Sequence, residues 1–199
     1  MSEELLKLEN IYKNFGNVKV LKNVNITINK GEVVALIGDN GAGKSTLIKV
    51  LSGVHPASNG EIKVDGEIVK FASPRQASDA GIGTVYQDLA LNNLTSVTLN
   101  FFLGRELKNE FGILDKREMY LRSALLLDKV KLKIDPNTRV EKLKVGERQL
   151  LEIAKALMLD TKVLIMDEPT SAITDSEAKI LFDIISGHRT TALTRACLL

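Results

Sequence analysis

Short apolar runs separated by turn signals fill the first part of the chain. Residues 5–15, 18–28 and 32–38 are rich in Leu, Ile and Val, and VNITI at 24–28 alternates strictly between apolar and polar positions, so we expect three strands here. Asn29-Lys30-Gly31 is a turn signal, and Asn59-Gly60 and Asp65-Gly66 flank IKV, which predicts a hairpin over 59–71. IGTVYQ at 82–87 is typical of a further short strand.

From about residue 90 to 157 the pattern changes to a helical period. KREMYLRSALLLDKVKLKI and ERQLLEIAKALML place their apolar residues three and four positions apart, so this segment predicts a helical insertion. The strand pattern returns with KVLIMDE at 162–168. Thr174 and Glu177 then form the sequence signature of a capping box in front of a helix, EAKILFDII. Strands that alternate with helices indicate an α/β fold.

One stretch between a predicted strand and a predicted helix carries candidate chemistry. The apolar run Val33–Ile37 reads as a buried strand, and Leu47, Ile48, Val50 and Leu51 recur at helical spacing. The sequence between them fits the pattern G-x-x-x-x-G-K-[ST]. The residues that we expect to bind a phosphate chain there are Gly38, Asp39, Asn40, Gly41, Ala42, Gly43, Lys44, Ser45 and Thr46.

The residue types of this loop suit a bound phosphate. Glycines let main-chain N–H groups approach an anion closely, and the following helix adds unpaired N–H groups and the positive end of its dipole. Lys44 can reach the outer phosphates, Ser45 can hold Mg²⁺, and Thr46 could assist at an inner phosphate. The alternative is a plain turn between a strand and a helix.

A second anchor lies at the end of the strand VLIMDE. Two carboxylates, Asp167 and Glu168, follow four apolar residues. Ligands collect at the carboxyl ends of parallel strands, where an Asp can hold Mg²⁺ and a second carboxylate can orient or deprotonate a water. A strand that simply meets solvent at two acids is the alternative, and the phosphate loop in the same chain argues against it.

Composition narrows the class of protein. The chain has 199 residues, of which 44% are hydrophobic, enough for one α/β domain with an inserted subdomain. The 27 basic and 25 acidic residues nearly cancel, which is no footprint of a nucleic-acid binder. The single cysteine, Cys197, excludes an intramolecular disulfide framework, and the charged N-terminus and the absence of a long apolar run predict a soluble, intracellular chain.

Together these motifs resemble the nucleotide-binding subunit of an ATP-binding cassette (ABC) transporter. The phosphate loop, TVYQD with Gln87, LKVGERQ at 143–149, the strand ending in Asp167-Glu168, and SAIT at 171–174 occur in the order of that family. The resemblance implies an α/β fold of the P-loop NTPase type, with a RecA-like core, an N-terminal antiparallel β-subdomain and a helical insertion. It implies a single nucleotide-binding domain over 1–199, with 1–86 and 158–199 as core and β-subdomain, 87–157 as helical signature subdomain and 187–199 as an atypical tail.

The family's roles carry over to matching positions. Gln87 and Glu168 would be catalytic, with Glu168 as general base, and Ser45, Gln87 and Asp167 would approach Mg²⁺. Phe15 in KNFG stands where the family stacks an aromatic ring on adenine, although a core position is the alternative. The signature stretch of this chain would close on the ATP of a second, head-to-tail cassette. The signature residues are Leu143, Lys144, Val145, Gly146 and Glu147.

Two features of the chain, the residue at 144 and the C-terminal tail, depart from the family pattern. Lys144 stands where the signature usually has a serine that donates to the γ-phosphate. GHRTTALTRACLL after LFDIIS shows no strand pattern, so we expect a truncated or frame-changed tail, an unpaired sheet edge, and His188 as a surface residue rather than the family's switch histidine. His55 is a loop histidine without a visible partner.

The middle of the chain resembles the first cassette of tandem-cassette importers for monosaccharides, and Thr174 in PTSAIT fits this. The resemblance implies ATP and Mg²⁺ as ligands, a second cassette, a membrane permease and, indirectly, a sugar-binding protein as partners, no nucleic acid, and a cytoplasmic location on the inner face of the membrane. We expect contact with the permease through 87–106. Some apolar residues of this segment must pack internally, and the rest would form the contact; the set is Leu89, Leu91, Leu94, Phe101, Phe102 and Leu103. The alternatives are an ATP-binding module with little or no hydrolysis, and a soluble cassette ATPase that acts on DNA or ribosomes.

Overall fold

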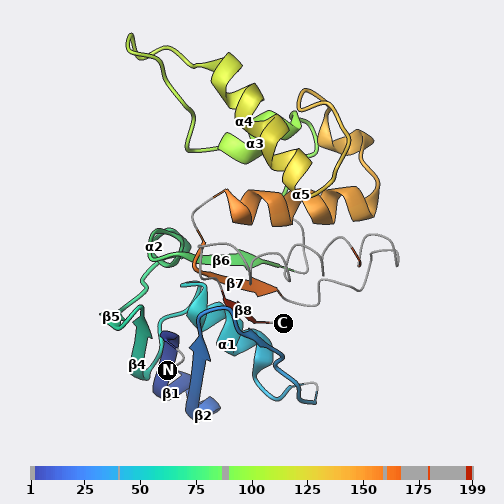
Figure 1. Ribbon diagram of the computed structural model, residues 1–199. Helices are drawn as coiled ribbons and strands as arrows, with labels where there is room; N and C mark the ends of the chain where they lie inside the picture. Colours follow the sequence, from blue (N-terminus) through green and yellow to red (C-terminus); the bar gives the residue numbers. More distant parts are fainter. Residues whose placement is uncertain are drawn as a thin grey trace. The chain divides into compact units, whose positions relative to one another are not determined.

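The computed structural model describes residues 3–39, 41–86, 90–158, 161–166, 179 and 196–198 (Figure 1). These residues form two compact units. The described residues of unit 1 come from Met1–Val85, Leu159–Glu168 and Ser186–Leu199, and those of unit 2 come from Tyr86–Met158 and Pro169–Ile185. Each unit has its own packing and is described separately.

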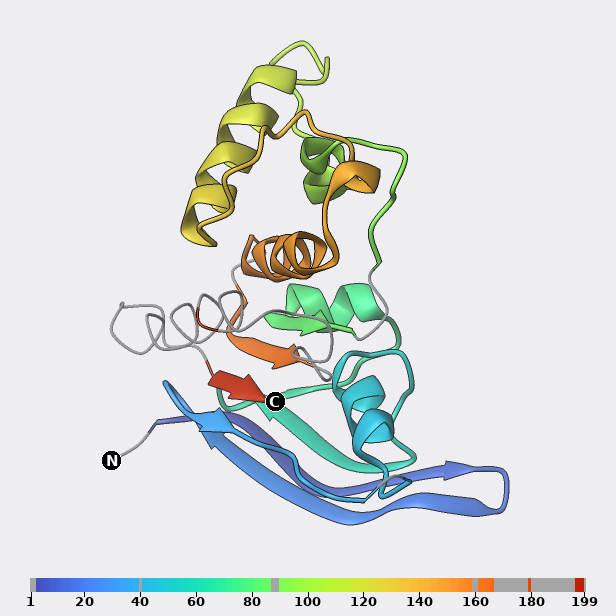
Figure 2. The same ribbon diagram turned by 90° about the vertical axis from the view of Figure 1, so that its right-hand side faces the viewer.

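An antiparallel sheet forms one side of unit 1. Its strands are β1 (Glu4–Phe15), β2 (Val18–Asn29), β4 (Asn59–Val64) and β5 (Glu67–Val69), in the order β2-β1-β4-β5. The two long strands β1 and β2 lie side by side along their length (Figure 2). The predicted strands over 5–15 and 18–28 and the β4–β5 hairpin are confirmed, and the hairpin turns at Asp65 and Gly66, both at positive φ.

Asn59-Gly60, expected to be a turn, begins strand β4 instead. A Cβ on Gly60 would lie 2.3 Å from the carbonyl oxygen of Asn10 on β1. Glycine is needed there because the neighbouring strand approaches too closely for any side chain. The sequence signal was therefore real, but it marked a close approach between strands rather than a chain reversal.

A parallel sheet forms the second layer of unit 1. Its strands are β3 (Val33–Val34), β6 (Ile82–Val85), β7 (Val163–Met166) and β8 (Ala196–Leu198), in the order β3-β8-β7-β6. Strand β7 is buried along its whole length, as its apolar run predicts. The prediction of a buried strand over 33–37 is wrong in extent, because β3 covers two half-buried residues and Ile37 is 91% exposed.

The tail contributes a strand, which contradicts the expected unpaired sheet edge. Residues 196–198 pair in parallel with β3, where Cys197 lies opposite Val33, and with β7, where Cys197 lies opposite Leu164. The pattern missed β8 because a three-residue strand is too short to show a period, and its pairing is non-local. His188 lies outside the described residues.

Two helices complete the described part of unit 1. Helix α1 (Lys44–Leu51) follows the phosphate loop, and α2 (Pro74–Asp79) begins after Ser73, whose hydroxyl accepts a hydrogen bond from the Gln76 N–H. One apolar core joins α1 to strands of both sheets. It includes the residues that the helical spacing selected, namely Leu47, Ile48, Val50 and Leu51.

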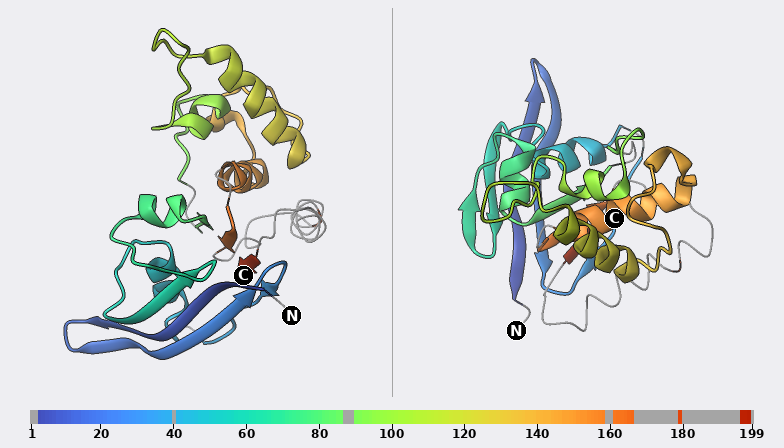
Figure 3. Two further views of the ribbon diagram at one scale, coloured as in Figure 1. Left: turned by 60° about the vertical axis from the view of Figure 1, so that its left-hand side comes forward. Right: turned by 90° about the horizontal axis from the view of Figure 1, so that it is seen from above.

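Unit 2 is helical, as the period over 90–157 predicts. It contains α3 (Val97–Phe102), α4 (Lys116–Lys129), the 3₁₀ turn η1 (Val140–Lys142) and α5 (Val145–Leu157), and α4 packs against both α3 and α5. The segment between α3 and α4 projects away from the helices (Figure 3). In the described part of the chain, no helix has the length and apolar character that a membrane crossing requires. The capping box at 174–177 lies outside the described residues.

Candidate phosphate-binding site

The loop in front of α1 has a backbone that only glycine adopts easily. Gly41 and Gly43 lie at φ +85° and +94°, in the left-handed region. A Cβ on Gly43 would lie 3.0 Å from Leu21 Cδ2 and 3.3 Å from the Val20 carbonyl oxygen, so β2 packs directly on the loop. A Cβ on Gly41 would have no atom of the described residues beyond its chain neighbours within 4 Å. Gly43 is therefore fixed by both conformation and packing, and Gly41 by conformation alone.

Lys44 folds back over this loop. Its ammonium group donates hydrogen bonds to the carbonyl oxygens of Gly38 and of Asp39, the second at 2.9 Å. The Ala42 N–H donates to the Asp39 carbonyl at 3.1 Å. The positive charge is thus held on the loop itself, at the start of the helix, where it adds to the positive end of the helix dipole.

The first turn of α1 offers donors to an anion. Gly43 is the N-cap and has no side chain to accept a hydrogen bond, while its carbonyl accepts from the Leu47 N–H at 2.9 Å. The N–H groups of the first turn have no intrahelical acceptor in any α-helix. Ser45 is exposed beside them and Thr46 is half-buried. This arrangement of glycine turns, free amides and a lysine is suited to a phosphate chain.

The predicted magnesium site is only partly visible. The exposed Ser45 hydroxyl fits a hard cation, which prefers oxygen ligands. Among the described residues no group of three or more His, Cys, Asp or Glu side chains could hold a metal ion. Mg²⁺ at phosphates usually relies on one or two protein ligands, phosphate oxygens and water, so this donor set is compatible with it. Asn40, Gln87, Asp167 and Glu168 lie outside the described residues.

Phe15, the predicted base-stacking residue, lies at the end of β1 and is 43% exposed. It pairs with Val18 across the β1–β2 turn, two residues before Val20, which contacts the phosphate loop. Its ring is not isolated: the Lys13 ammonium lies 4.9 Å from the ring centroid, and the His55 ring lies 5.2 Å away, edge to face.

The predicted signature residues surround the start of α5. Leu143 and Gly146 are buried, whereas Lys144 and Val145 are exposed. The Lys144 N–H donates to a carboxylate oxygen of Glu147 at 2.8 Å. This is one of the two hydrogen bonds of a capping box. The other is missing, because the Lys144 ammonium cannot accept a hydrogen bond from a backbone N–H in the first turn.

Arg148 closes the turn that leads into α5. Its guanidinium donates to the carbonyl oxygens of Leu143 and Glu141, each at 3.0 Å. The sequence pattern did not single out this residue. These two bonds hold the backbone in front of α5 and involve no atom of Lys144.

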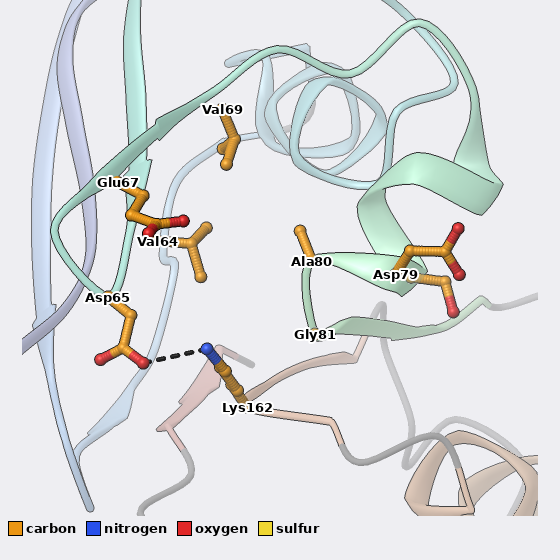
Figure 4. Close-up of a pocket in the computed structure, with 9 residues that line it drawn as sticks. Val64, Asp65, Glu67, Val69, Asp79, Ala80, Gly81 and Lys162 are labelled. Carbon is orange, nitrogen blue, oxygen red and sulfur yellow. Dashed lines mark hydrogen bonds and ion pairs between the residues drawn. The ribbon is translucent and has the colours of Figure 1, made fainter.

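A separate cavity of about 410 Å³ lies elsewhere in unit 1 (Figure 4). The Asp65 carboxylate, on the β4–β5 turn, pairs there with the Lys162 ammonium at 2.9 Å and with Lys30 at 3.6 Å. These pairs lower the pKa of Asp65, with the hydrogen bond from Lys162 as the main cause. Among the described residues, none of the predicted site residues lines this cavity, so it is distinct from the described part of the phosphate loop.

Sequence reasoning also missed Lys13 and the partner of His55. Strand β1 buries Leu6, Leu8 and Ile11, and Lys13 follows Ile11 at the two-residue period of a strand. That period could have placed Lys13 on the inward face. The contact between His55 and Phe15 had no local signal, because the two residues are far apart in sequence.

The comparisons with solved structures identify the fold. The chain resembles the ADP conformation of MJ1267, an ATP-binding cassette of an ABC transporter, at a TM-score of 0.82 and 28% identity, over 98% of this chain and 80% of that one. A nucleotide-free ATP-binding cassette from an ABC transporter gives a TM-score of 0.83 at 28% identity, over 98% of this chain and 81% of that chain. The fold class is therefore that of P-loop ATP-binding cassettes, as predicted.

The sequence comparisons identify the family. The family model described as ABC transporter matches residues 21–171, so the chain belongs to the ABC transporter family. A ribose import ATP-binding protein of Lactococcus lactis subsp. lactis is 46% identical over 92% of this chain, and a xylose import ATP-binding protein of Photobacterium profundum is 46% identical over 93% of it. The match covers 37% of each of those two proteins, so this chain spans little more than a third of their length.

Proposed function

We propose that this chain binds Mg-ATP at the phosphate loop and serves as the first ATP-hydrolysing cassette of a monosaccharide importer. The observation that carries the proposal is the loop itself. Gly41 and Gly43 hold the left-handed turns, Lys44 places its ammonium on the loop, and the first turn of α1 supplies free donors. Similarity to ribose and xylose import proteins supports the transport role.

Each predicted site residue has its own role in binding or hydrolysing the nucleotide. The backbone amides of Gly41 and of 43–46 and Lys44 bind the β- and γ-phosphates, Ser45 with Asp167 and Gln87 would hold Mg²⁺, and Phe15 receives the base. Mg²⁺ neutralises charge that develops on the transferred phosphoryl group. Glu168 acts as general base toward the attacking water.

The working assembly is a head-to-tail pair of cassettes beneath a membrane permease, on the cytoplasmic face of the membrane, with a sugar-binding protein as indirect partner. Exposed apolar side chains in unit 2 support a permease contact: Leu94 is 73% and Leu103 65% exposed. Phe101 and Phe102 are buried, Leu91 is half-buried, and Leu89 lies outside the described residues.

A nucleotide titration tests the proposal. Lys44→Ala removes a charge-assisted contact and should weaken binding of a labelled ATP by about tenfold or more, since such contacts contribute roughly 1.5–3 kcal/mol. Lys49→Ala is the matched control, because Lys49 lies exposed at the other end of α1. Equal affinities in wild type and Lys44→Ala would overturn the assignment.

An ATP-binding module with little hydrolysis is the second candidate, and Lys144 favours it. The family's hydroxyl at this position donates to a γ-phosphate, whereas here an exposed ammonium occupies the start of α5. Turnover of the purified chain separates the two functions. The transport ATPase requires ATP hydrolysis that Glu168→Gln abolishes, and the module requires tight binding with no turnover above that variant.

A further inference from the structure

The Phe15 ring is held by two side chains that the proposed ATPase mechanism does not use. The Lys13 ammonium lies over the ring at 4.9 Å from its centroid. The His55 ring meets it at 80° with centroids 5.2 Å apart, an edge-to-face contact. Both geometries are attractive for an aromatic ring. A ring that is 43% exposed is therefore fixed in direction by its neighbours.

These neighbours are themselves fixed. Lys13 is only 9% exposed, and its ammonium donates to the Pro56 carbonyl at 2.8 Å. The Ser58 N–H donates to the Tyr12 carbonyl at 2.8 Å, and the Ser58 hydroxyl accepts from the Asn14 N–H at 3.0 Å. The loop that carries His55 is thus hydrogen-bonded to β1 on both sides of Lys13.

The same loop is continuous with the phosphate-binding helix. The His55 N–H donates to the Lys49 carbonyl at 3.0 Å, in the last turn of α1. Helix α1 begins at Lys44 on the phosphate loop. The contact between His55 and Phe15 and the phosphate loop therefore lie at opposite ends of one short helix. The β1–β2 hairpin connects them as well, because it carries Phe15 and its Val20 lies against the phosphate loop.

We propose that Lys13 and His55 are positioning residues that orient Phe15 as a platform for the base of the bound nucleotide. This inference rests on the proposed ATP binding. An exposed phenyl group must lose rotational freedom when a base stacks on it, and contacts already present in the free protein remove that cost. Lys13 and His55 thus raise affinity for the nucleoside part of the ligand and leave the phosphate contacts unchanged.

The test compares two ligands by calorimetric titration: Mg-ATP, and inorganic tripolyphosphate, which has no base. His55→Ala and Lys13→Met should each weaken ATP binding about three- to tenfold, the range expected for one aromatic or cation–π contact. Phe15→Ala should weaken it at least as much. Tripolyphosphate affinity should stay within about twofold of wild type in all three, because that ligand does not reach the ring.

Conservative variants show whether weaker ATP binding comes from the lost contact with the ring or from a loss of folding. His55→Phe keeps an aromatic edge and Lys13→Arg keeps a cation over the ring, so both should recover most of the ATP affinity. Lys19→Met is the matched control for Lys13→Met, since Lys19 is exposed on the neighbouring strand β2.

The outcomes separate this inference from the function on which it rests. Equal losses for ATP and tripolyphosphate would overturn it, since the variants would then act through the phosphate loop. Unchanged ATP affinity in Phe15→Ala or His55→Ala would overturn it as well. If the wild type binds neither ligand, the proposed function itself is wrong, and the inference about Lys13, His55 and Phe15 is wrong as well.

Discussion

At the residue scale, glycines 41 and 43 look alike in sequence but differ in the structure. Both have a left-handed backbone, but only at Gly43 would an added Cβ meet Val20 and Leu21 of β2. Gly41→Ala should destabilise the chain by about 1–2 kcal/mol, the cost of a left-handed Cβ. Gly43→Ala should cost more, because a methyl group would also push against β2. Denaturant unfolding of both variants measures the difference, and equal costs would show that the loop gives way without strain.

At the scale of elements, α5 begins with an incomplete cap. A serine at 144 could accept from the N–H of the first turn, as the lysine cannot, so Lys144→Ser should raise the free energy of unfolding by about 1 kcal/mol. Lys142→Ser, an exposed lysine in η1, is the matched control and should have no stabilising effect. If the two variants are equally stable, the Lys144 N–H and Glu147 already supply all the capping that α5 needs.

Helix α5 also carries a buried carboxyl. Glu152 is 8% exposed, one of its carboxylate oxygens has no hydrogen-bond partner among the described residues, and the Lys155 ammonium lies 4.0 Å away. Burial raises the pKa of Glu152, and Lys155 and the Ala90 backbone only partly oppose this. A carboxyl with a raised pKa stabilises the fold below its usual value of 4.5, and that contribution is lost as pH rises through the folded-state pKa.

Glu152→Gln should therefore be more stable than wild type at pH 7, and the advantage should shrink as pH falls toward 4.5. Thermal or denaturant unfolding at several pH values measures it. A constant difference across this range would mean that the carboxyl does not titrate there.

The same elements show what the sequence could and could not predict. Strand β7 was predictable because it is a short continuous apolar run, and helix α1 because its apolar residues recur at helical spacing; both sets are buried. The end of β3 was not, because Ile37 is apolar yet 91% exposed. Strand β8 and the platform around Phe15 depend on contacts between distant residues, for which a local pattern holds no signal. The phosphate loop was predictable because its chemistry requires fixed residues at fixed spacing.

At the scale of the whole molecule, unit 2 presents apolar side chains to solvent. Leu94 and Leu103 are exposed, whereas Phe101 between them is 2% exposed. Replacing both leucines with Ser should leave ATP affinity and folding unchanged but reduce co-purification with a permease of the monosaccharide-importer class. Phe101→Ser should lower stability by several kcal/mol, because it removes a buried aromatic ring. If the double variant still co-purifies fully, the proposed contact through these two leucines is wrong.

The central claim is that a nucleotide binds on the loop before α1, and amide hydrogen exchange of the intact chain with and without Mg-ATP tests it most directly. We predict that ATP slows exchange of the amides of Gly41 and of residues 43–46, which would donate to phosphate oxygens, and that Lys44→Ala needs about tenfold or more ATP to reach the same slowing. Saturating ATP without protection of these amides, or the same dependence of protection on ATP concentration in wild type and Lys44→Ala, would contradict the account.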